Sequence, residues 1–140
     1  MTPDIVLDTN VLLVSISPRS PYRWIFDAFI DEQFAICVTT EILFEYEEII
    51  TKHMGKKVAE TVLQIIENAV NVNMITSYYK WNIINADPDD NKFTDCAISA
   101  NAHFIVTEDK HFNIAKTIKF PKLNVIGIDE FHEVIIELNY

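Results

Sequence analysis

Acidic residues interrupt apolar segments of this chain at points where a carboxylate needs a partner. The stretch DIVLDTNVLL (4–13) places Asp8 within a run of Val, Ile and Leu, and the stretch HFIVTED (103–109) ends on Asp109. An isolated charge in a dry interior costs even more than the ~2–7 kcal/mol of an unpaired polar group. Each of these acids is therefore expected to end a strand, to accept hydrogen bonds or to bind a cation.

Two further regions supply acids for the same chemistry. Glu45 lies in TTEILFEYEEII (39–50), and Asp89, Asp90 and Asp95 lie in DPDDNKFTD (87–95). Clustered carboxylates repel one another, so they persist only with a cation or with bound protons. Oxygen ligands suit Mg²⁺ or Mn²⁺. Two such ions roughly 4 Å apart activate water and stabilise the leaving oxygen of a phosphodiester. The acids therefore indicate metal-dependent phosphodiester chemistry.

The elements that must position these acids alternate along the chain. Apolar runs predict strands, and apolar residues at helical spacing predict helices. The expected strands are 4–13, 34–38, 72–77, 103–109 and 123–128, and the expected helices are 21–32, 39–55, 56–69, 89–102, 111–116 and 129–138. This alternation predicts a three-layer α/β/α sandwich with a mostly parallel sheet of about five strands. Sites in such sheets form beyond the carboxyl ends of the strands, which would bring Asp8 and Asp109 to one edge.

The composition fits one cytoplasmic domain over residues 1–140. A chain of 140 residues with 49% hydrophobic residues has the size and apolar content of one domain with one core. No apolar run approaches the ~18–20 residues of a membrane span. No basic stretch precedes the first apolar run, so we expect no signal peptide. Cys37 and Cys96 lie in apolar settings and are expected to be reduced core residues.

The charge restricts how this chain would bind nucleic acid. A formal net charge of −10 argues against tight, nonspecific binding of a phosphate backbone, which needs Lys and Arg. Any nucleic-acid function must use a local site, a bound metal or a basic partner. Lys92, Lys110 and Lys80 are candidate phosphate contacts or ordinary surface lysines. The aromatic cluster in SYYKWN (77–82) either borders a substrate groove or partner site or is structural.

Structural interpretations compete with the metal site. Asp8 alone would also serve as a cap for backbone N–H groups, and Asp90 would also complement the positive end of a helix. Glu41 and Glu48 share the helical face of Glu45, and a run of acids on a helix is usually a solvated face. The four histidines are expected to be structural. The order of all four acidic regions, rather than any single motif, favours the metal site.

The segments IVLDTNVLL, TTEILFEYEEII, DPDDNKF and FIVTEDKHF together resemble the PIN domain family over nearly the whole chain. More narrowly, they resemble the stand-alone, VapC-like bacterial PIN proteins described as toxins of toxin–antitoxin pairs. This resemblance implies an endoribonuclease that cleaves single-stranded RNA with Mg²⁺ or Mn²⁺. It also implies a four-acid site on an α/β sandwich.

Motif by motif, the resemblance assigns the first acid to Asp8 of LDTN, the second to Glu45 and the fourth to Asp109 of VTED. Asn10 and Thr107 match polar positions beside the acids, where they would orient water or a carboxylate. Each of these assignments is an expectation that depends on the resemblance.

The third acid has two candidates. The phrase DPDDNKF favours Asp90 at the start of a helix. Asp95 is five positions later, about 140° away on an ideal helix, so both side chains are not equal ligands. Asp90 is the expected ligand, and Asp95 is retained as a supporting or alternative one.

The resemblance also implies partners: an RNA substrate, a small antitoxin that inserts an Arg or Lys side chain between the acids, and a second copy in a homodimer. No membrane partner is expected. Two other classes remain open. The first is a PIN-like protein-binding module with weak or no catalysis, which the acidic charge favours. The second is a phosphoacceptor receiver domain, which the single acid of LDTN disfavours.

Overall fold

The computed structural model describes residues 2–139, which form a five-stranded sheet and the helices around it. The strands are β1 (Asp4–Leu7), β2 (Ala35–Val38), β3 (Val72–Met74), β4 (Phe104–Val106) and β5 (Val125–Ile126). The α-helices are α1 (Thr9–Ile16), α2 (Arg23–Ile30), α3 (Thr40–Met54), α4 (Lys56–Asn68), α5 (Asn91–Ala100) and α6 (Ile128–Leu138). Two 3₁₀ segments, η1 (Pro88–Asp90) and η2 (Lys110–Thr117), precede α5 and follow β4.

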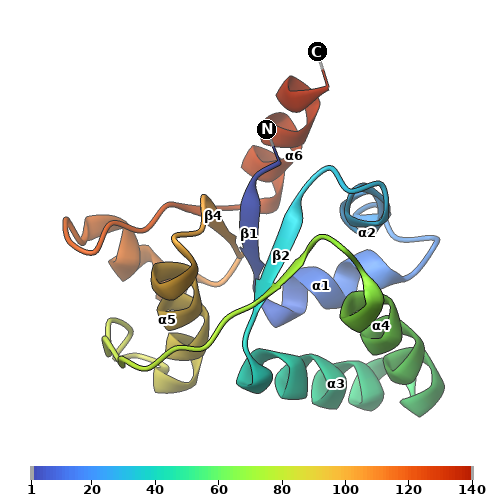
Figure 1. Cartoon of the computed structure of the whole chain (residues 1–140), viewed down its shortest axis with the longest axis horizontal. Coiled ribbons are helices and arrows are strands. Elements are labelled where there is room, and N and C mark those ends of the chain that lie inside the picture. Colours follow the sequence, from blue (N-terminus) through green and yellow to red (C-terminus); the bar gives the residue numbers. More distant parts are fainter. Residues whose placement is uncertain (1, 140) are drawn as a thin grey trace.

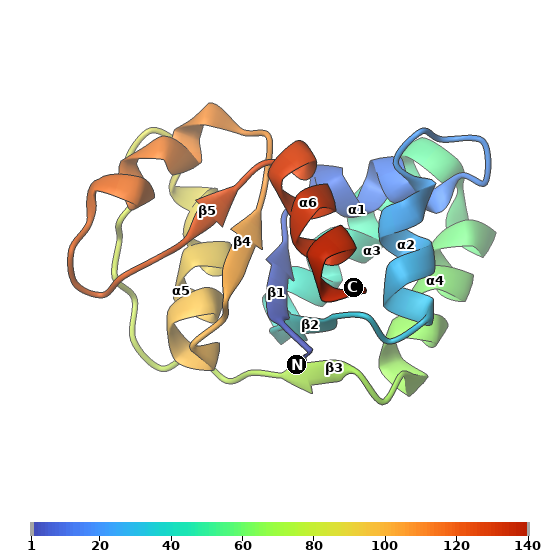
Figure 2. The ribbon, with the colours of Figure 1, turned by 90° about the horizontal axis from the view of Figure 1, so that it is seen from above.

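The sheet has the strand order β3-β2-β1-β4-β5, and every neighbouring pair is parallel. β1 is the central strand (Figure 1), with β4 and β5 extending the sheet on one side of it and β2 and β3 on the other (Figure 2). In the register of β1 and β4, Leu7 lies opposite Val106, so the residues after both strands emerge at one edge. The predicted parallel sheet is confirmed.

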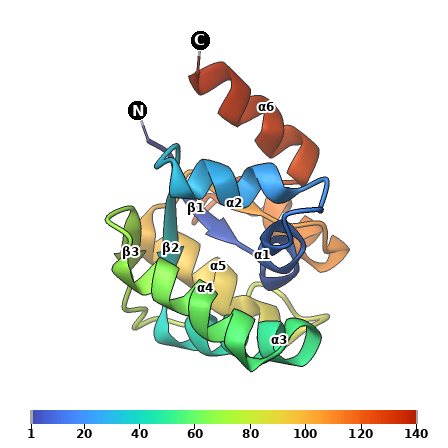
Figure 3. The ribbon, with the colours of Figure 1, turned by 90° about the vertical axis from the view of Figure 1, so that its right-hand side faces the viewer.

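Helices cover both faces of the sheet. Figure 3 shows α2 and α6 on one side of the strands and α3, α4 and α5 on the other. On the first side, the rings of Trp24 in α2 and Phe131 in α6 are 5.6 Å apart. On the second side, Phe93 and Cys96 of α5 are buried. Since apolar side chains of β1 lie between the two helical layers, the predicted three-layer α/β/α sandwich is confirmed.

The strand expected over 4–13 is wrong in its second half. β1 ends at Leu7, and α1 begins at Thr9. The N–H groups of Val11 and Leu12 donate to the carbonyl of Asp8 at 3.0 and 3.1 Å, which starts the helix there. A continuous apolar run is compatible with a buried strand and with a buried helix, so its periodicity does not locate this junction.

The other expected elements are present, with several shorter than predicted. The strands expected over 72–77, 103–109 and 123–128 retain only two or three residues each as β3, β4 and β5. The predicted ends of α3 are confirmed: the Thr39 side chain accepts from the Ile42 N–H at 3.2 Å, and Gly55 has φ of 94°. Among residues 2–139, no helix has the length and apolar character needed to span a membrane.

Candidate metal centre

Asp8 lies at the edge of the sheet where β1 and β4 end. Its backbone N–H donates to the carbonyl of Val106 at 3.1 Å, which continues the pairing of the two strands by one residue. Thr107, the residue after β4, donates its hydroxyl to Asp8 Oδ2 at 2.7 Å. The same hydroxyl oxygen accepts the backbone N–H of Asp109 at 3.0 Å. Thr107 therefore holds the carboxylate of Asp8 and the start of the Asp109 loop together.

The carboxylate of Asp8 is buried among other acids. The residue is 6% exposed. Burial raises the pKa of this carboxyl, the hydroxyl of Thr107 lowers it, and the negative charges of Asp109 and Glu45 raise it further. The net effect is a raised pKa, which means that the folded chain disfavours the charge of Asp8. A positive ion at this position would reverse that penalty.

The pKa of Asp90 is also raised, and by more than that of Asp8. Asp90 ends η1, whose start is capped by the Asp87 side chain. Burial raises the pKa of Asp90 to about 7, with further contributions from the charges of Asp87, Asp109 and Asp8. Within residues 2–139, Asp90 Oδ2 is a buried side-chain oxygen with no hydrogen-bond partner. An acceptor of this kind is costly unless something binds it.

Glu45 reaches the cluster from α3. Its Oε2 accepts a hydrogen bond from the Thr9 hydroxyl at the start of α1. Its Oε1 forms an ion pair of 2.7 Å with Lys92 Nζ, which also contacts Asp89 at 3.2 Å. Burial lowers the pKa of Lys92, but the hydrogen bonds and charges of Glu45 and Asp89 leave it raised. Lys92 therefore remains a cation that holds Glu45 in place.

Tyr46 fixes the same part of α3 against the sheet. Its side chain is fully buried, and its hydroxyl donates to the carbonyl of Leu7 at 2.6 Å. Leu7 is the last residue of β1, so this hydrogen bond ties the residue next to Glu45 to the strand that presents Asp8.

The structure separates the two candidates for the third acid. Asp90 contributes to one electrostatic cluster with Asp8 and Asp109. The carboxylate of Asp95 instead accepts the backbone N–H of Trp81 at 3.1 Å. Burial raises the pKa of Asp95, and the charged groups that act on it are Lys80 and Glu41 rather than the other three expected ligands.

The polar residues expected beside the acids differ in their surroundings. Thr107 is buried and bonded to Asp8. Asn10 is exposed at the start of α1 and lines a hollow of about 350 Å³ together with Asp8 and Asp109. Thr107 thus contacts a carboxylate directly, while Asn10 borders the space in front of the acids.

His111 and Asp87 were not anticipated as part of this cluster. His111 Nδ1 lies 3.4 Å from Asp109 Oδ1 and 3.7 Å from Asp90 Oδ2. One ligand atom from each of Asp87, Asp90 and His111 lies within 4.8 Å of the others. Asp87 stands in the same acidic phrase as Asp90, which was a usable signal. His111 gave none, because nothing in the spacing of a single histidine distinguishes a ligand from a structural residue.

The donor set fits a hard divalent cation. Carboxylates from the β1–α1 junction, α3, η1 and the loop after β4 could supply oxygen ligands. Asp90 Oδ2, which has no hydrogen-bond partner within residues 2–139, is one of them. The raised pKa values of Asp8 and Asp90, together with the buried Asp90 Oδ2 that lacks a hydrogen-bond partner in the described part of the chain, match what a bound cation would relieve. Asp8, Glu45, Asp90 and Asp109 stay the predicted ligands, and of these four only Asp90 belongs to the group of ligand atoms within 4.8 Å of one another that it forms with Asp87 and His111.

The structure defines a class of domain with a three-layer, parallel α/β sandwich and acidic residues at the carboxyl edge of its sheet. A PIN domain model matches residues 4–111, more than half of the sequence. The chain belongs to the PIN domain family. None of the curated proteins compared with it matches significantly.

Solved structures of similar fold support this assignment. VapBC2 from Rickettsia felis, bound to a DNA fragment from the promoter, matches with a TM-score of 0.62 and 17% identity over 89% of this chain and 98% of that one. VapC20 from Mycobacterium tuberculosis, a toxin that cleaves the sarcin–ricin loop, matches with a TM-score of 0.59 and 10% identity over 82% and 97%. The PIN domain of RRP44 from T. brucei matches with a TM-score of 0.54 and 12% identity, over 99% of this chain and 84% of that one. At these identities the likeness concerns the fold.

Proposed function

We propose that this protein is a metal-dependent endoribonuclease that cleaves single-stranded RNA and acts as the toxin of a toxin–antitoxin pair. The observation that carries the proposal is the position of Asp90 Oδ2, a buried oxygen that finds no hydrogen-bond partner among residues 2–139 and lies near the carboxyl groups of Asp8 and Asp109. Membership of the PIN family supports nuclease chemistry. Similar folds in a toxin that cleaves the sarcin–ricin loop and in VapBC complexes support the RNA substrate and the toxin role.

Asp8, Glu45, Asp90 and Asp109 would hold Mg²⁺ or Mn²⁺. Such an ion, when bound, neutralises charge that develops on a phosphodiester and makes water a stronger nucleophile at neutral pH. The protein's own part is to fix the ligands. Thr107 holds the carboxylate of Asp8, and the Asp109 loop begins on the same hydroxyl.

Other residues hold the predicted ligands in position or border the space in front of them. Thr9 and Lys92 hold the two oxygens of Glu45. Asn10, which lines the hollow in front of Asp8 and Asp109, would orient water or a carboxylate there. We assign no ligand role to Asp95, whose carboxylate is bonded to the backbone of Trp81.

A small antitoxin is the proposed protein partner. The hollow in front of Asp8 and Asp109 is also lined by Val14 and Tyr22, each 38% exposed. An Arg or Lys side chain of the antitoxin would enter between the acids while apolar residues beside it pack on Val14 and Tyr22. We extend the proposal to a homodimer and a cytoplasmic location, where the buried Cys37 and Cys96 stay reduced.

An RNA cleavage assay tests the proposed reaction. Purified protein is incubated with single-stranded RNA and Mn²⁺, and the products are separated on a gel. We expect cleavage that EDTA abolishes and that Asp8→Asn slows at least about 100-fold, because one ligand of the cluster loses its charge. Asp95→Asn is the matched control, since it removes a buried carboxylate outside the cluster and is expected to retain most of the activity.

Three outcomes contradict the proposal. Cleavage that survives EDTA or Asp8→Asn would show that the metal cluster is not responsible. An Asp95→Asn variant as impaired as Asp8→Asn would place the third ligand at Asp95. Absence of cleavage together with tight binding of a basic protein would favour the protein-binding module.

A further inference from the structure

Four of the eleven Lys and Arg residues of this acidic chain lie in the segment that leads to β5, the last strand, and continues past it. Residues 110–128 contain four lysines and no acidic residue, in a chain with a formal net charge of −10. A local segment of charge +4 on such a background is the feature that an acidic protein needs to approach a phosphate backbone.

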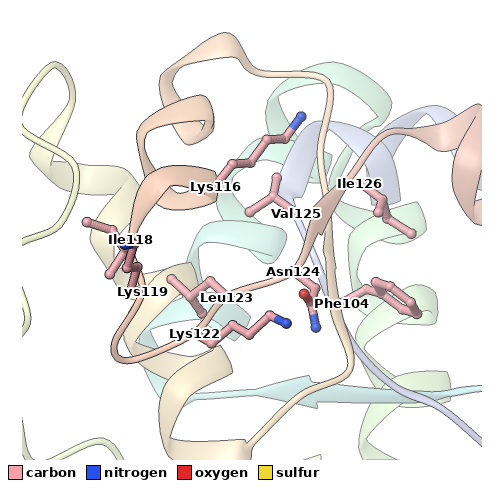
Figure 4. Close-up of a pocket in the computed structure, with 9 residues that line it drawn as sticks. All are labelled: Phe104, Lys116, Ile118, Lys119, Lys122, Leu123, Asn124, Val125 and Ile126. Carbon is pink, nitrogen blue, oxygen red and sulfur yellow. The ribbon is translucent and has the colours of Figure 1, made fainter.

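Three of these lysines surround one hollow beside the edge strand. The hollow, of about 520 Å³, lies along β5 and is lined by Lys116, Lys119 and Lys122 (Figure 4). Figure 4 shows the side chains of Lys116 and Lys122 extended from η2 and from the loop before β5. All three lysines are exposed. Asn124 lines the same hollow and adds a neutral donor and acceptor.

Three aromatic rings lie close to these lysines, two of them exposed and the third, that of Trp81, half-buried. Phe120, between Lys119 and Lys122 in the sequence, is 84% exposed. Its ring centroid is 6.4 Å from that of Trp81, in the loop between β3 and η1. Trp81 in turn is 4.6 Å from the ring of Tyr79, which is 64% exposed. Aromatic faces among lysines are the combination that binds single-stranded nucleic acid, because every base has a face that can stack.

The hollow continues toward the acid cluster. A second hollow shares Lys116, Val125 and Ile126 with the first and reaches Thr107 and Asp109. A strand whose phosphates follow Lys122, Lys119 and Lys116 would pass into this second hollow, which Lys110, Glu108 and Glu130 also line, and would reach Asp109 there. Mutual attraction of lysines and phosphates brings the substrate to a cluster that would otherwise repel it.

We propose that Tyr79, Trp81, Lys116, Lys119, Phe120 and Lys122, here called the lysine–aromatic surface, bind one flank of a single-stranded RNA substrate. The lysines contact phosphates, and Phe120 and Trp81 stack on unpaired bases. This inference rests on the proposed function and deepens it, because it names the surface that holds the RNA outside the cleavage site.

The test measures RNA binding apart from cleavage. Anisotropy of a fluorescein-labelled, unstructured oligouridine is followed against protein concentration in EDTA at several salt concentrations. The triple variant Lys116→Gln, Lys119→Gln, Lys122→Gln is expected to bind at least about tenfold more weakly. Its slope of log affinity against log salt should be shallower by about 2, since three contacts to a single strand are lost.

The matched control removes the same charge elsewhere. Lys52→Gln, Lys56→Gln, Lys57→Gln changes three exposed lysines of α3 and α4 and should leave affinity and slope close to those of the unaltered protein. Phe120→Ala should weaken binding at least about fivefold without changing the salt slope, because it removes stacking rather than charge. Thermal melts by circular dichroism check that each variant is folded.

Equal losses in the two triple variants, or unchanged binding in the first, would overturn the inference. If oligoglutamate of matched charge displaces the RNA as effectively as unlabelled oligouridine does, the surface binds acidic protein and the RNA assignment is also overturned. The proposed function is tested by a different outcome. RNA that binds through this surface but is never cleaved with Mn²⁺ would contradict the proposed nuclease activity. Cleavage that the triple lysine variant leaves unaffected would contradict the proposed RNA-binding surface.

Discussion

At the residue scale, Asp90 has the two properties that most clearly indicate a cation site: a buried oxygen and a raised pKa. Its Oδ2 is buried without a hydrogen-bond partner among residues 2–139, and burial with neighbouring charges raises its pKa to about 7. The sequence indicated Asp90 through the phrase DPDDNKF. The pKa shift depends on acids that come from other strands, so only the folded chain reveals it.

Replacing Asp90 should stabilise the metal-free protein at high pH. The folded-state pKa of about 7 exceeds the ordinary value of 3.8, so between these values the folded chain binds more protons than the unfolded chain. Its stability therefore falls as pH rises through this window, and the full penalty is present above pH 7. Asp90→Asn in EDTA should raise the free energy of unfolding at pH 8 by roughly 1–2 kcal/mol, with little gain near pH 4.

Urea denaturation at both pH values measures this difference. Glu48→Gln, which removes an exposed carboxylate from α3, is the control and should change stability little at either pH. A gain for Asp90→Asn that is the same at pH 4 and pH 8, or a loss at pH 8, would contradict the assigned ionisation.

At the element scale, the central question was where β1 ends. The pattern of DIVLDTNVLL predicted one strand over 4–13, whereas the chain turns at Asp8 into α1. Both halves of the run are buried, so alternation between faces was not available as a signal. Parallel pairing was predictable because helices alternate with strands, whereas the strand order β3-β2-β1-β4-β5 is known only from the structure. The junction itself depends on hydrogen bonds that the apolar pattern does not encode.

The position of Glu45 depends on another contact between elements. The Tyr46 hydroxyl is bonded to the carbonyl of Leu7, and the residue is fully buried. Tyr46→Phe keeps the ring but leaves this carbonyl without that donor. The free energy of unfolding should fall by about 1–3 kcal/mol.

Tyr79→Phe is the matched control, since Tyr79 is 64% exposed and its hydroxyl can exchange hydrogen bonds with water. Chemical denaturation should find the control within about 0.5 kcal/mol of the unaltered protein. A Tyr46→Phe variant of undiminished stability would show that the hydroxyl does not hold α3 to β1.

At the scale of the whole molecule, acidic and basic side chains gather in different parts of the surface. Acids from four segments gather where β1 and β4 end, and the four lysines of residues 110–128 lie around β5. The net charge of −10 suggested weak attraction for RNA, and the total concealed this division. A net charge is a sum over the whole sequence, so it does not show that the acids and the lysines occupy separate surfaces. The folded structure was needed to locate them.

The central claim is that Asp8, Glu45, Asp90 and Asp109 bind one divalent cation or two. Isothermal titration calorimetry with Mn²⁺ tests it most directly, on the unaltered protein, Asp8→Asn, Asp109→Asn and Asp95→Asn at pH 6 and pH 8. We expect Mn²⁺ binding that strengthens with pH, because Asp90, whose pKa is raised to about 7, must lose its proton to bind the ion. It should be lost in Asp8→Asn and Asp109→Asn and kept in Asp95→Asn. Unchanged Mn²⁺ affinity in Asp8→Asn and Asp109→Asn would contradict the claim.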